Sequence, residues 1–164
     1  MRKISVRRRD RVMIRPELEF VYEAGGALGE PVPIGETVDG TRRIIPIFSG
    51  PVSGPRIKGE LLGNAADWQL TRPDGVTVAD ANYAMKTDDD VVLQIRNRGL
   101  RHGAPEVMKR LAAGEDVDPA GYYFRTIPEF IAPIGKYDWL NKSVFVCAGA
   151  RYARSIKLWV WRVV

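Results

Sequence analysis

The chain alternates apolar and polar residues with a period of two in a series of short runs. In residues 17–24, Leu18, Phe20, Tyr22 and Ala24 lie on one face, and three glutamates lie on the other. Such alternation is typical of a β-strand with one buried face. The same pattern predicts strands at 41–50, 56–63, 66–72, 76–87, 91–98, 122–130, 143–150 and 155–164. Residues 25–40 are rich in Gly and Pro and are expected to form a long loop, with a short extended piece around 32–34.

Turn signals separate these runs. Pro73-Asp74-Gly75 predicts a hairpin between 66–72 and 76–87, since proline fixes φ and glycine tolerates a tight reversal. Thr87 to Asp90 marks the next reversal. Residues 104–114 predict one short helix, with Pro105 in its first turn and Gly114 as its stop.

Eight or nine strands and one short helix indicate an all-β protein. We expect a single antiparallel β-barrel of the lipocalin or calycin type, because closure removes exposed strand edges and such a barrel can enclose a small ligand. The 164 residues suit one domain. We therefore expect a barrel domain at 17–164, preceded by a basic arm at 1–16.

The net charge of +5 arises at the N-terminus. Residues 1–15 contain seven of the 25 basic residues and one of the 20 acidic residues, so the rest of the chain is nearly neutral. The arm could contact nucleic acid, although a solvated leader is the simpler interpretation. The single cysteine, Cys147, excludes an intramolecular disulfide, and the sequence shows no signal peptide and no apolar run of membrane length. These features predict a cytoplasmic protein.

Several chemistries are disfavoured by composition. One histidine and one cysteine cannot supply the usual zinc or copper site, and there is no Walker loop and no Gly-x-Ser-x-Gly elbow. The acidic turn at 88–90 lacks the glycine and distant glutamate of a calcium loop, so a solvated hairpin tip is favoured. We expect neither a metal nor an organic cofactor.

The stretch Asp67-Trp68-Gln69 suggests a binding site. Strand alternation places Asp67 and Gln69 on one face and Trp68 on the other. In one register the two polar side chains point into the barrel and Trp68 packs outside. In a register shifted by one residue, Trp68 lines the pocket and Asp67 lies on the surface.

Four blocks of the sequence carry a resemblance to a known family. They are "RRIIPI" with the following "SG", "GNAADWQLTRPDG", "NRGLRHGAPEVMKRLAAGEDVDP", and "YYFRTIPEF" followed by "YDWLNKSVFV". In order and spacing, from about Leu18 to Val164, they resemble domain of unknown function family 3237, which occurs in bacteria and fungi. The resemblance implies a small antiparallel β-barrel and little about function. Its motif positions correspond to residues 67–69, 101–103, 123–125 and 139–141.

The chain departs from the family pattern in two places. Phe130-Ile131-Ala132 stands where the family is expected to have Phe-Glu-Thr, so an acid is missing there. Asp89-Asp90 stands where an Asp-Gly turn is usual. The first departure affects any mechanism that relies on that carboxylate, and the second affects turn geometry.

The leading hypothesis is a barrel that binds a small apolar or aromatic molecule and performs cofactor-free acid-base chemistry of the isomerase, hydratase or lyase type. Asp67 is the candidate general base, and Tyr83, Tyr123 and Arg125 are candidate hydrogen-bond donors to a developing oxyanion. The candidate substrate-binding residues are Trp68, Gln69, Arg98, His102, Phe124, Trp139 and Asn141.

Two alternatives stay open at the sequence level. The same pocket could belong to a noncatalytic carrier or sensor, in which Asp67 only accepts hydrogen bonds from the protein. The last strand also has two apolar faces, because Trp159 and Trp161 alternate with Leu158 and Val160. One of these faces could pack against a second copy in a homo-oligomer, or against the outer side of the N-terminal strand and the helix of the same chain.

Overall fold

The structure is a computed structural model that describes residues 13–164. Residues 1–12, which hold most of the basic arm, lie outside the described residues. The strands are β1 (Leu18–Ala27), β2 (Val32–Thr37), β3 (Gly40–Ile47), β4 (Gly50–Ser53), β5 (Gly59–Leu61), β6 (Ala65–Thr71), β7 (Thr77–Thr87), β8 (Val92–Gly103), β9 (Tyr122–Ile131), β10 (Val144–Arg151) and β11 (Ser155–Val163). The helices are α1 (Pro105–Ala112) and two short 3₁₀ helices, η1 (Pro119–Gly121) and η2 (Asp138–Lys142).

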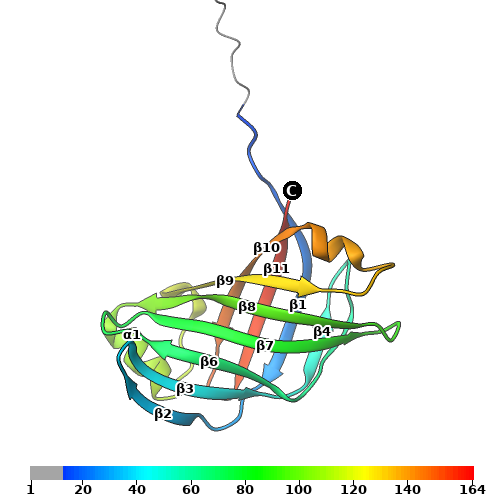
Figure 1. Cartoon of the computed structure of the whole chain (residues 1–164). Helices are drawn as coiled ribbons and strands as arrows, with labels where there is room; N and C mark the ends of the chain where they lie inside the picture. The colour runs from blue at the N-terminus through cyan, green and yellow to red at the C-terminus, as the bar shows by residue number, and fades with distance from the viewer. Residues whose placement is uncertain (1–12) are drawn as a thin grey trace, which may run out of the picture.

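The strands of the described residues form one closed antiparallel barrel (Figure 1). Their order is β2-β3-β6-β7-β5-β4-β1-β11-β10-β9-β8, and a further pairing of β7 with β8 closes the sheet. β3 and β4 act as two parts of one bent strand, as do β5 and β6, since β3 pairs with β6 and β4 pairs with β5. The barrel wall therefore has eight strands, with β2 added beside β3. The all-β barrel expected from the sequence is confirmed.

The expected loop at 25–40 is wrong over most of its length, whereas the short extended piece expected around 32–34 lies within β2. β1 continues to Ala27, and β2 runs from Val32 to Thr37, with only a tight turn before β3. β2 pairs with β3 alone among the described residues, and its apolar side chains Val32 and Ile34 are half exposed. An edge strand outside the barrel wall buries neither face, so it shows no alternation that a sequence pattern could reveal.

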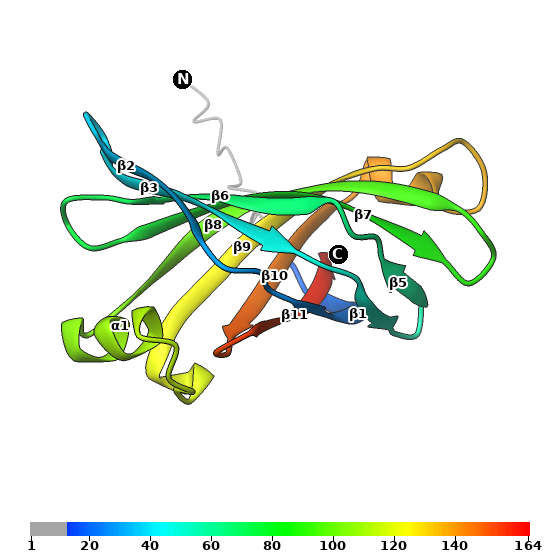
Figure 2. The same ribbon diagram turned by 90° about the horizontal axis from the view of Figure 1, so that it is seen from below.

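Two apolar clusters fill the barrel from opposite ends. The larger cluster lies toward η2 and includes Tyr22, Leu93, Leu140 and Phe145. The smaller one lies under α1 and consists of Ala79, Leu111, Val117, Tyr122 and Phe124. Figure 2 shows α1 and the segment around η2 at opposite ends of the molecule. Within residues 13–164, neither α1 nor the shorter helices have the length and apolar character needed to span a membrane.

The acidic turn after β7 is hydrogen-bonded to the residues that precede η2. The Asp89 carboxylate accepts hydrogen bonds from Tyr137 Oη and Lys136 Nζ, both at 2.7 Å, and from the Thr87 hydroxyl. Asp90 has φ 64°, the left-handed region that favours glycine and that aspartate tolerates. This explains why an Asp-Asp pair can replace the Asp-Gly turn of the family pattern. The hydrogen bonds give Asp89 a structural role that a solvated tip would lack.

Candidate functional site

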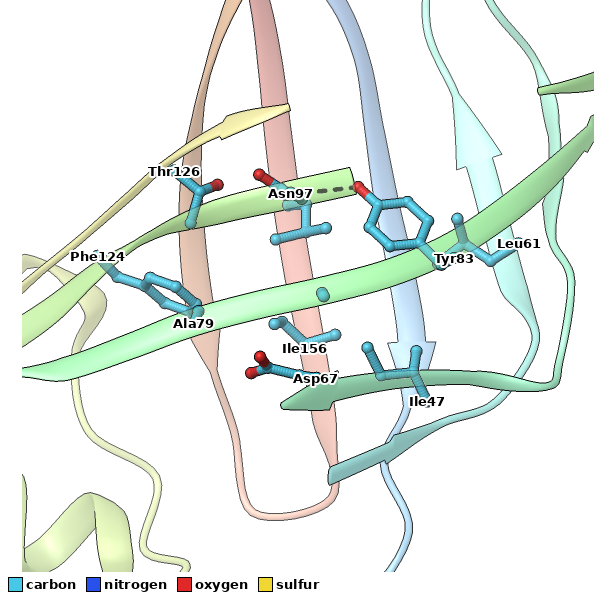
Figure 3. Close-up of a pocket in the computed structure, with 11 residues that line it drawn as sticks. Ile47, Leu61, Asp67, Ala79, Tyr83, Asn97, Phe124, Thr126 and Ile156 are labelled. Carbon is cyan, nitrogen blue, oxygen red and sulfur yellow. Dashed lines mark hydrogen bonds between the residues drawn. The ribbon is translucent and has the colours of Figure 1, made fainter. Parts of the chain in front are cut away.

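A partly enclosed cavity of about 30 Å³ lies inside the barrel, between the two apolar clusters (Figure 3). Most of its wall is apolar, and a few polar side chains reach it from different strands. This composition is typical of small-molecule sites, in which a few polar groups orient a mainly apolar ligand. The lining residues are Ile47, Leu61, Asp67, Ala79, Ala81, Tyr83, Asn97, Phe124, Thr126, Ile156 and Leu158.

Strand β6 places Asp67 and Gln69 inside the barrel and Trp68 outside. Asp67 and Gln69 are 7% and 3% exposed, whereas Trp68 is 50% exposed. The first of the two registers considered for this strand is therefore the one adopted. Pairing of β6 with β3 on one side and with β7 on the other fixes this register, since a slip of one residue would bury Trp68 and expose the interior face.

The Asp67 carboxylate is held by a short chain of hydrogen bonds. Its Oδ1 accepts from the backbone N–H of Asp80 at 2.8 Å, and its Oδ2 accepts from Gln69 Nε2 at 2.7 Å. Gln69 Oε1 in turn accepts from Arg43 Nε at 3.0 Å. Gln69 thus fixes the orientation of Asp67 and separates it from the Arg43 guanidinium. A carboxylate held in one orientation beside a cavity can act on a ligand without first reorganising.

Burial raises the pKa of Asp67, because desolvation disfavours the charged carboxylate. The hydrogen bonds from Gln69 and from the Asp80 amide oppose this effect, as does the positive charge of Arg101. The pKa nevertheless remains above its ordinary value. A carboxylate of raised pKa is a stronger base than one in water, which suits proton abstraction.

The raised pKa of Asp67 predicts a pH-dependent stability. The folded state binds more protons at this site than the unfolded state, so its contribution is complete below about pH 4 and is lost as pH rises through the folded pKa. We expect the free energy of unfolding of wild type to fall, relative to that of Asp67→Asn, between about pH 4 and neutrality. Urea denaturation of both proteins across this range measures the difference. A difference that moves the opposite way would mean that folding lowers the pKa.

Tyr83, Asn97 and Thr126 add polar groups to the cavity wall from β7, β8 and β9. Asn97 Nδ2 donates to Tyr83 Oη at 3.4 Å, and burial raises the pKa of Tyr83, so its hydroxyl stays protonated. Asn97 Oδ1 and Thr126 Oγ1 are buried and have no hydrogen-bond partner among the described residues. Buried polar atoms are nearly always satisfied in native proteins, so these two oxygens are exceptions among the polar groups of the cavity wall.

Three buried or half-buried arginines lie near Asp67 and were missed by the sequence reasoning. They are Arg43 on β3, Arg101 on β8 and Arg151 on β10. Strand alternation could have identified Arg101, because it shares the inward face of β8 with Ile95 and Asn97. Arg98, the arginine of β8 that the sequence predicts at the site, has the opposite parity and lies on the outer face.

Five of the residues expected at the site lie on the outer face of the barrel. Tyr123, Arg125, Arg98 and His102 occupy the outward positions of β8 and β9, as Trp68 does on β6. They contact one another or other surface groups: the His102 and Tyr123 rings stack at 4.8 Å, and Arg98 Nε lies 3.4 Å from the Asp80 carboxylate. Along each strand, these outward residues alternate with residues that point into the barrel. They therefore occur in the same sequence motifs as the cavity residues, although their side chains lie outside.

Trp139 and Asn141 lie at the η2 end, away from the cavity. The Trp139 ring packs on Phe145 with a centroid distance of 6.0 Å, and the Arg56 guanidinium lies 4.6 Å above it. Asn141 bonds both backbone groups of Ala132 at 2.9 Å. Ile131 is 64% exposed on the outer face, so the acid that the family pattern has there would lie outside the barrel.

The remaining reactive side chain in the interior is Cys147. Burial raises the pKa of its thiol to about 11, so it stays protonated at neutral pH and behaves as a small apolar group. Among the described residues, no group of three or more His, Cys, Asp or Glu side chains is placed to hold a metal ion. The titratable side chains that line the cavity are Asp67 and Tyr83.

Several of the known proteins that this chain resembles in sequence and structure are described as having unknown function. A family model described as "Protein of unknown function (DUF3237)" matches residues 16–163. The UPF0311 protein of Rhodopseudomonas palustris (strain TIE-1) is 38% identical over 147 residues, which are 90% of this chain and 96% of that protein. The crystal structure of the conserved protein of unknown function RPA1785 from Rhodopseudomonas palustris matches with a TM-score of 0.89 and 38% identity, over 93% of this chain and 100% of that chain. A structure described as an enzyme from Penicillium herquei shares the fold at 18% identity, with a TM-score of 0.69 over 93% of this chain and 97% of that chain.

Proposed function

The chain belongs to the DUF3237 family of proteins of unknown function, and we propose that its barrel binds a small apolar or aromatic molecule and performs acid-base chemistry on it. The main support for this proposal is the position of Asp67: its carboxylate is buried, has a raised pKa and lines a mostly apolar cavity. The reaction class is isomerisation, hydration or elimination. Isomerisation and elimination can begin with removal of a proton from carbon, hydration is the reverse of elimination and begins with removal of a proton from water, and none of the three needs a cofactor.

The roles of the cavity residues follow from their protonation states. Asp67 removes a proton from carbon next to a carbonyl group, and the carbonyl oxygen becomes an oxyanion. The Tyr83 hydroxyl, kept protonated by burial, donates a hydrogen bond to that oxygen. Asn97 and Thr126 supply further polar contacts, and Phe124 contacts the apolar body of the ligand.

Binding of an aromatic ring requires the interior to expand. The cavity of about 30 Å³ holds at most a few water molecules, whereas a benzene-sized guest occupies a cavity of about 150 Å³. We infer that Phe124 is the side chain that moves, because it lines the cavity and belongs to the smaller of the two apolar clusters, under α1. The proposal therefore implies that the α1 end of the barrel rearranges when a ligand enters.

One observation favours a second candidate function, that of a noncatalytic carrier or sensor. Both oxygens of Asp67 already accept hydrogen bonds from the protein, which gives the buried carboxylate a structural explanation. The two functions share the cavity and differ only in proton transfer. The cytoplasmic location and the self-association inferred from the sequence stay predictions under either function.

Binding to the interior can be tested by methyl NMR with benzamide as the probe. We expect benzamide to shift the methyl signals of Ile47, Leu61 and Ile156, which line the cavity, and not those of Ile127 on the outer face. Gly149→Ala is expected to weaken this binding at least about tenfold. A Cβ at Gly149 would lie 2.6 Å from the Phe124 ring, so this ring, which lines the cavity, would have to shift.

Gly63→Ala is the matched control, since a Cβ at Gly63 meets nothing within 4 Å. It should bind benzamide as wild type does. Unchanged signals of the cavity methyl groups in wild type would contradict the proposed interior site. Equal affinity in Gly149→Ala and wild type would show that benzamide binds elsewhere.

A further inference from the structure

An excess of positive charge lies near Asp67, on three arginines of which one is buried and two are half-buried. The guanidinium groups of Arg43, Arg101 and Arg151 come from three strands and act electrostatically on one another and on a single carboxylate, Asp67. None of these four groups forms an ion pair within 4.0 Å among residues 13–164. Arg43 is bonded to Gln69, and Arg151 Nε donates to the backbone oxygen of Tyr152 at 2.9 Å. This cluster therefore holds more positive than negative charge.

Arg101 is the least compensated member of this cluster. Its side chain is 5% exposed, and its buried Nε has no hydrogen-bond partner in the described part of the chain. Burial, together with the charges of Arg151 and Arg43, lowers its pKa to about 10, which leaves it charged at neutral pH. A buried guanidinium with an unsatisfied donor is unfavourable, so such residues are normally paired or serve a ligand.

The position of Arg101 connects it to the cavity. Its Cα lies opposite that of Phe124 in the β8–β9 pairing, and its Cζ lies 5.5 Å from the centroid of the Phe124 ring. That ring lines the cavity. A ligand whose apolar body displaces or contacts Phe124 would therefore bring its other end near the guanidinium.

We propose that the ligand carries a carboxylate group and that Arg101, supported by Arg43 and Arg151, binds this group while the apolar body occupies the cavity. The inference rests on the proposed interior binding function and adds the chemical class of the ligand. A guanidinium matches the geometry of a carboxylate with two parallel hydrogen bonds, so a carboxylate is its natural partner. Such a ligand would balance the excess positive charge of the cluster and leave Asp67 free to act as a base.

The test compares benzoate with benzamide, which have nearly the same shape and differ in charge. We expect benzoate to bind wild type about 10- to 100-fold more tightly than benzamide, because hydrogen bonds between charged groups contribute more binding free energy than those between neutral groups. Affinities are taken from titrations of the cavity methyl signals at neutral pH. Arg101→Met should remove the preference for benzoate and keep the affinity for benzamide, and Arg101→Lys should keep part of the preference.

Arg98→Met is the matched control on the same strand, because Arg98 lies on the outer face and pairs with Asp80. It should bind both probes as wild type does. If benzamide shifts the cavity signals and benzoate binds no more tightly, the carboxylate inference is overturned while the proposed binding function stands. If neither probe shifts those signals, the binding function itself fails. A preference that persists in a folded Arg101→Met variant would also overturn the role of Arg101.

Discussion

Replacement of Asp67 by asparagine is expected to slow proton abstraction in the cavity by at least about 100-fold while ligand binding persists. Asparagine has nearly the same shape as aspartate, so the wall of the cavity is retained, but its amide cannot accept a proton. The reaction to follow is hydrogen–deuterium exchange of the methyl group of acetophenone in deuterated buffer, measured by proton NMR. Wild type should accelerate this exchange above the rate in buffer.

Asp74→Asn is the control for this experiment, because Asp74 is an exposed carboxylate in the turn that follows β6. Its exchange rate should equal that of wild type. Equal rates in wild type and Asp67→Asn would refute the assignment of Asp67 as the base. Acetophenone that shifts the cavity methyl signals of wild type and exchanges only at the rate in buffer would support the carrier or sensor instead.

Replacement of Arg101 by methionine is expected to stabilise the ligand-free protein by about 1–4 kcal/mol. Neutral pH lies below both the folded pKa of Arg101, about 10, and its ordinary value, so the guanidinium is charged in both states and the full cost of burying it is present. Methionine retains a flexible apolar side chain that can pack on Phe124. Urea denaturation at neutral pH measures the change.

Arg98→Met provides the baseline for this comparison. The Arg98 side chain is 58% exposed, and its ion pair with Asp80 lies on the surface, so we expect a change of less than about 1 kcal/mol. A loss of stability in Arg101→Met by more than that amount would mean that the guanidinium makes net favourable interactions in the free protein. Its excess charge would then give no reason to expect an anionic ligand.

A gain in stability and a loss of benzoate binding in the same variant would identify Arg101 as a residue kept for function. Natural proteins often retain destabilising groups where a ligand must be recognised. The unpartnered Asn97 and Thr126 oxygens beside the cavity fit the same interpretation. Together, Arg101, Asn97 and Thr126 give the interior several buried polar atoms that have no hydrogen-bond partner within the described residues.

The relation between sequence and structure differs between the fold and the site. The period of two in β6, β8 and β9 was sufficient to predict strands, because a barrel wall buries one face of each strand and exposes the other. Only a short extended piece of β2, around 32–34, was predicted, because β2 lies beside the wall and buries neither face. For the site, the alternation separated Asp67 from Trp68, but it could not state which of them faces inward.

The sequence by itself determined the all-β class, the positions of most strands, the hairpin at 72–76 and the short helix, since each depends on local periodicity and turn chemistry. The tertiary structure decided which polar residues line the cavity, as Asp67 and Tyr83 do, and which lie near Asp67, as the arginines do. Asp67, Tyr83 and Arg101 come from β6, β7 and β8, and Arg43 and Arg151 come from β3 and β10. Their proximity results from barrel closure, which joins strands far apart in the chain, and residues such as Tyr123 and Arg125 were turned outward by the same alternation that directed Phe124 inward.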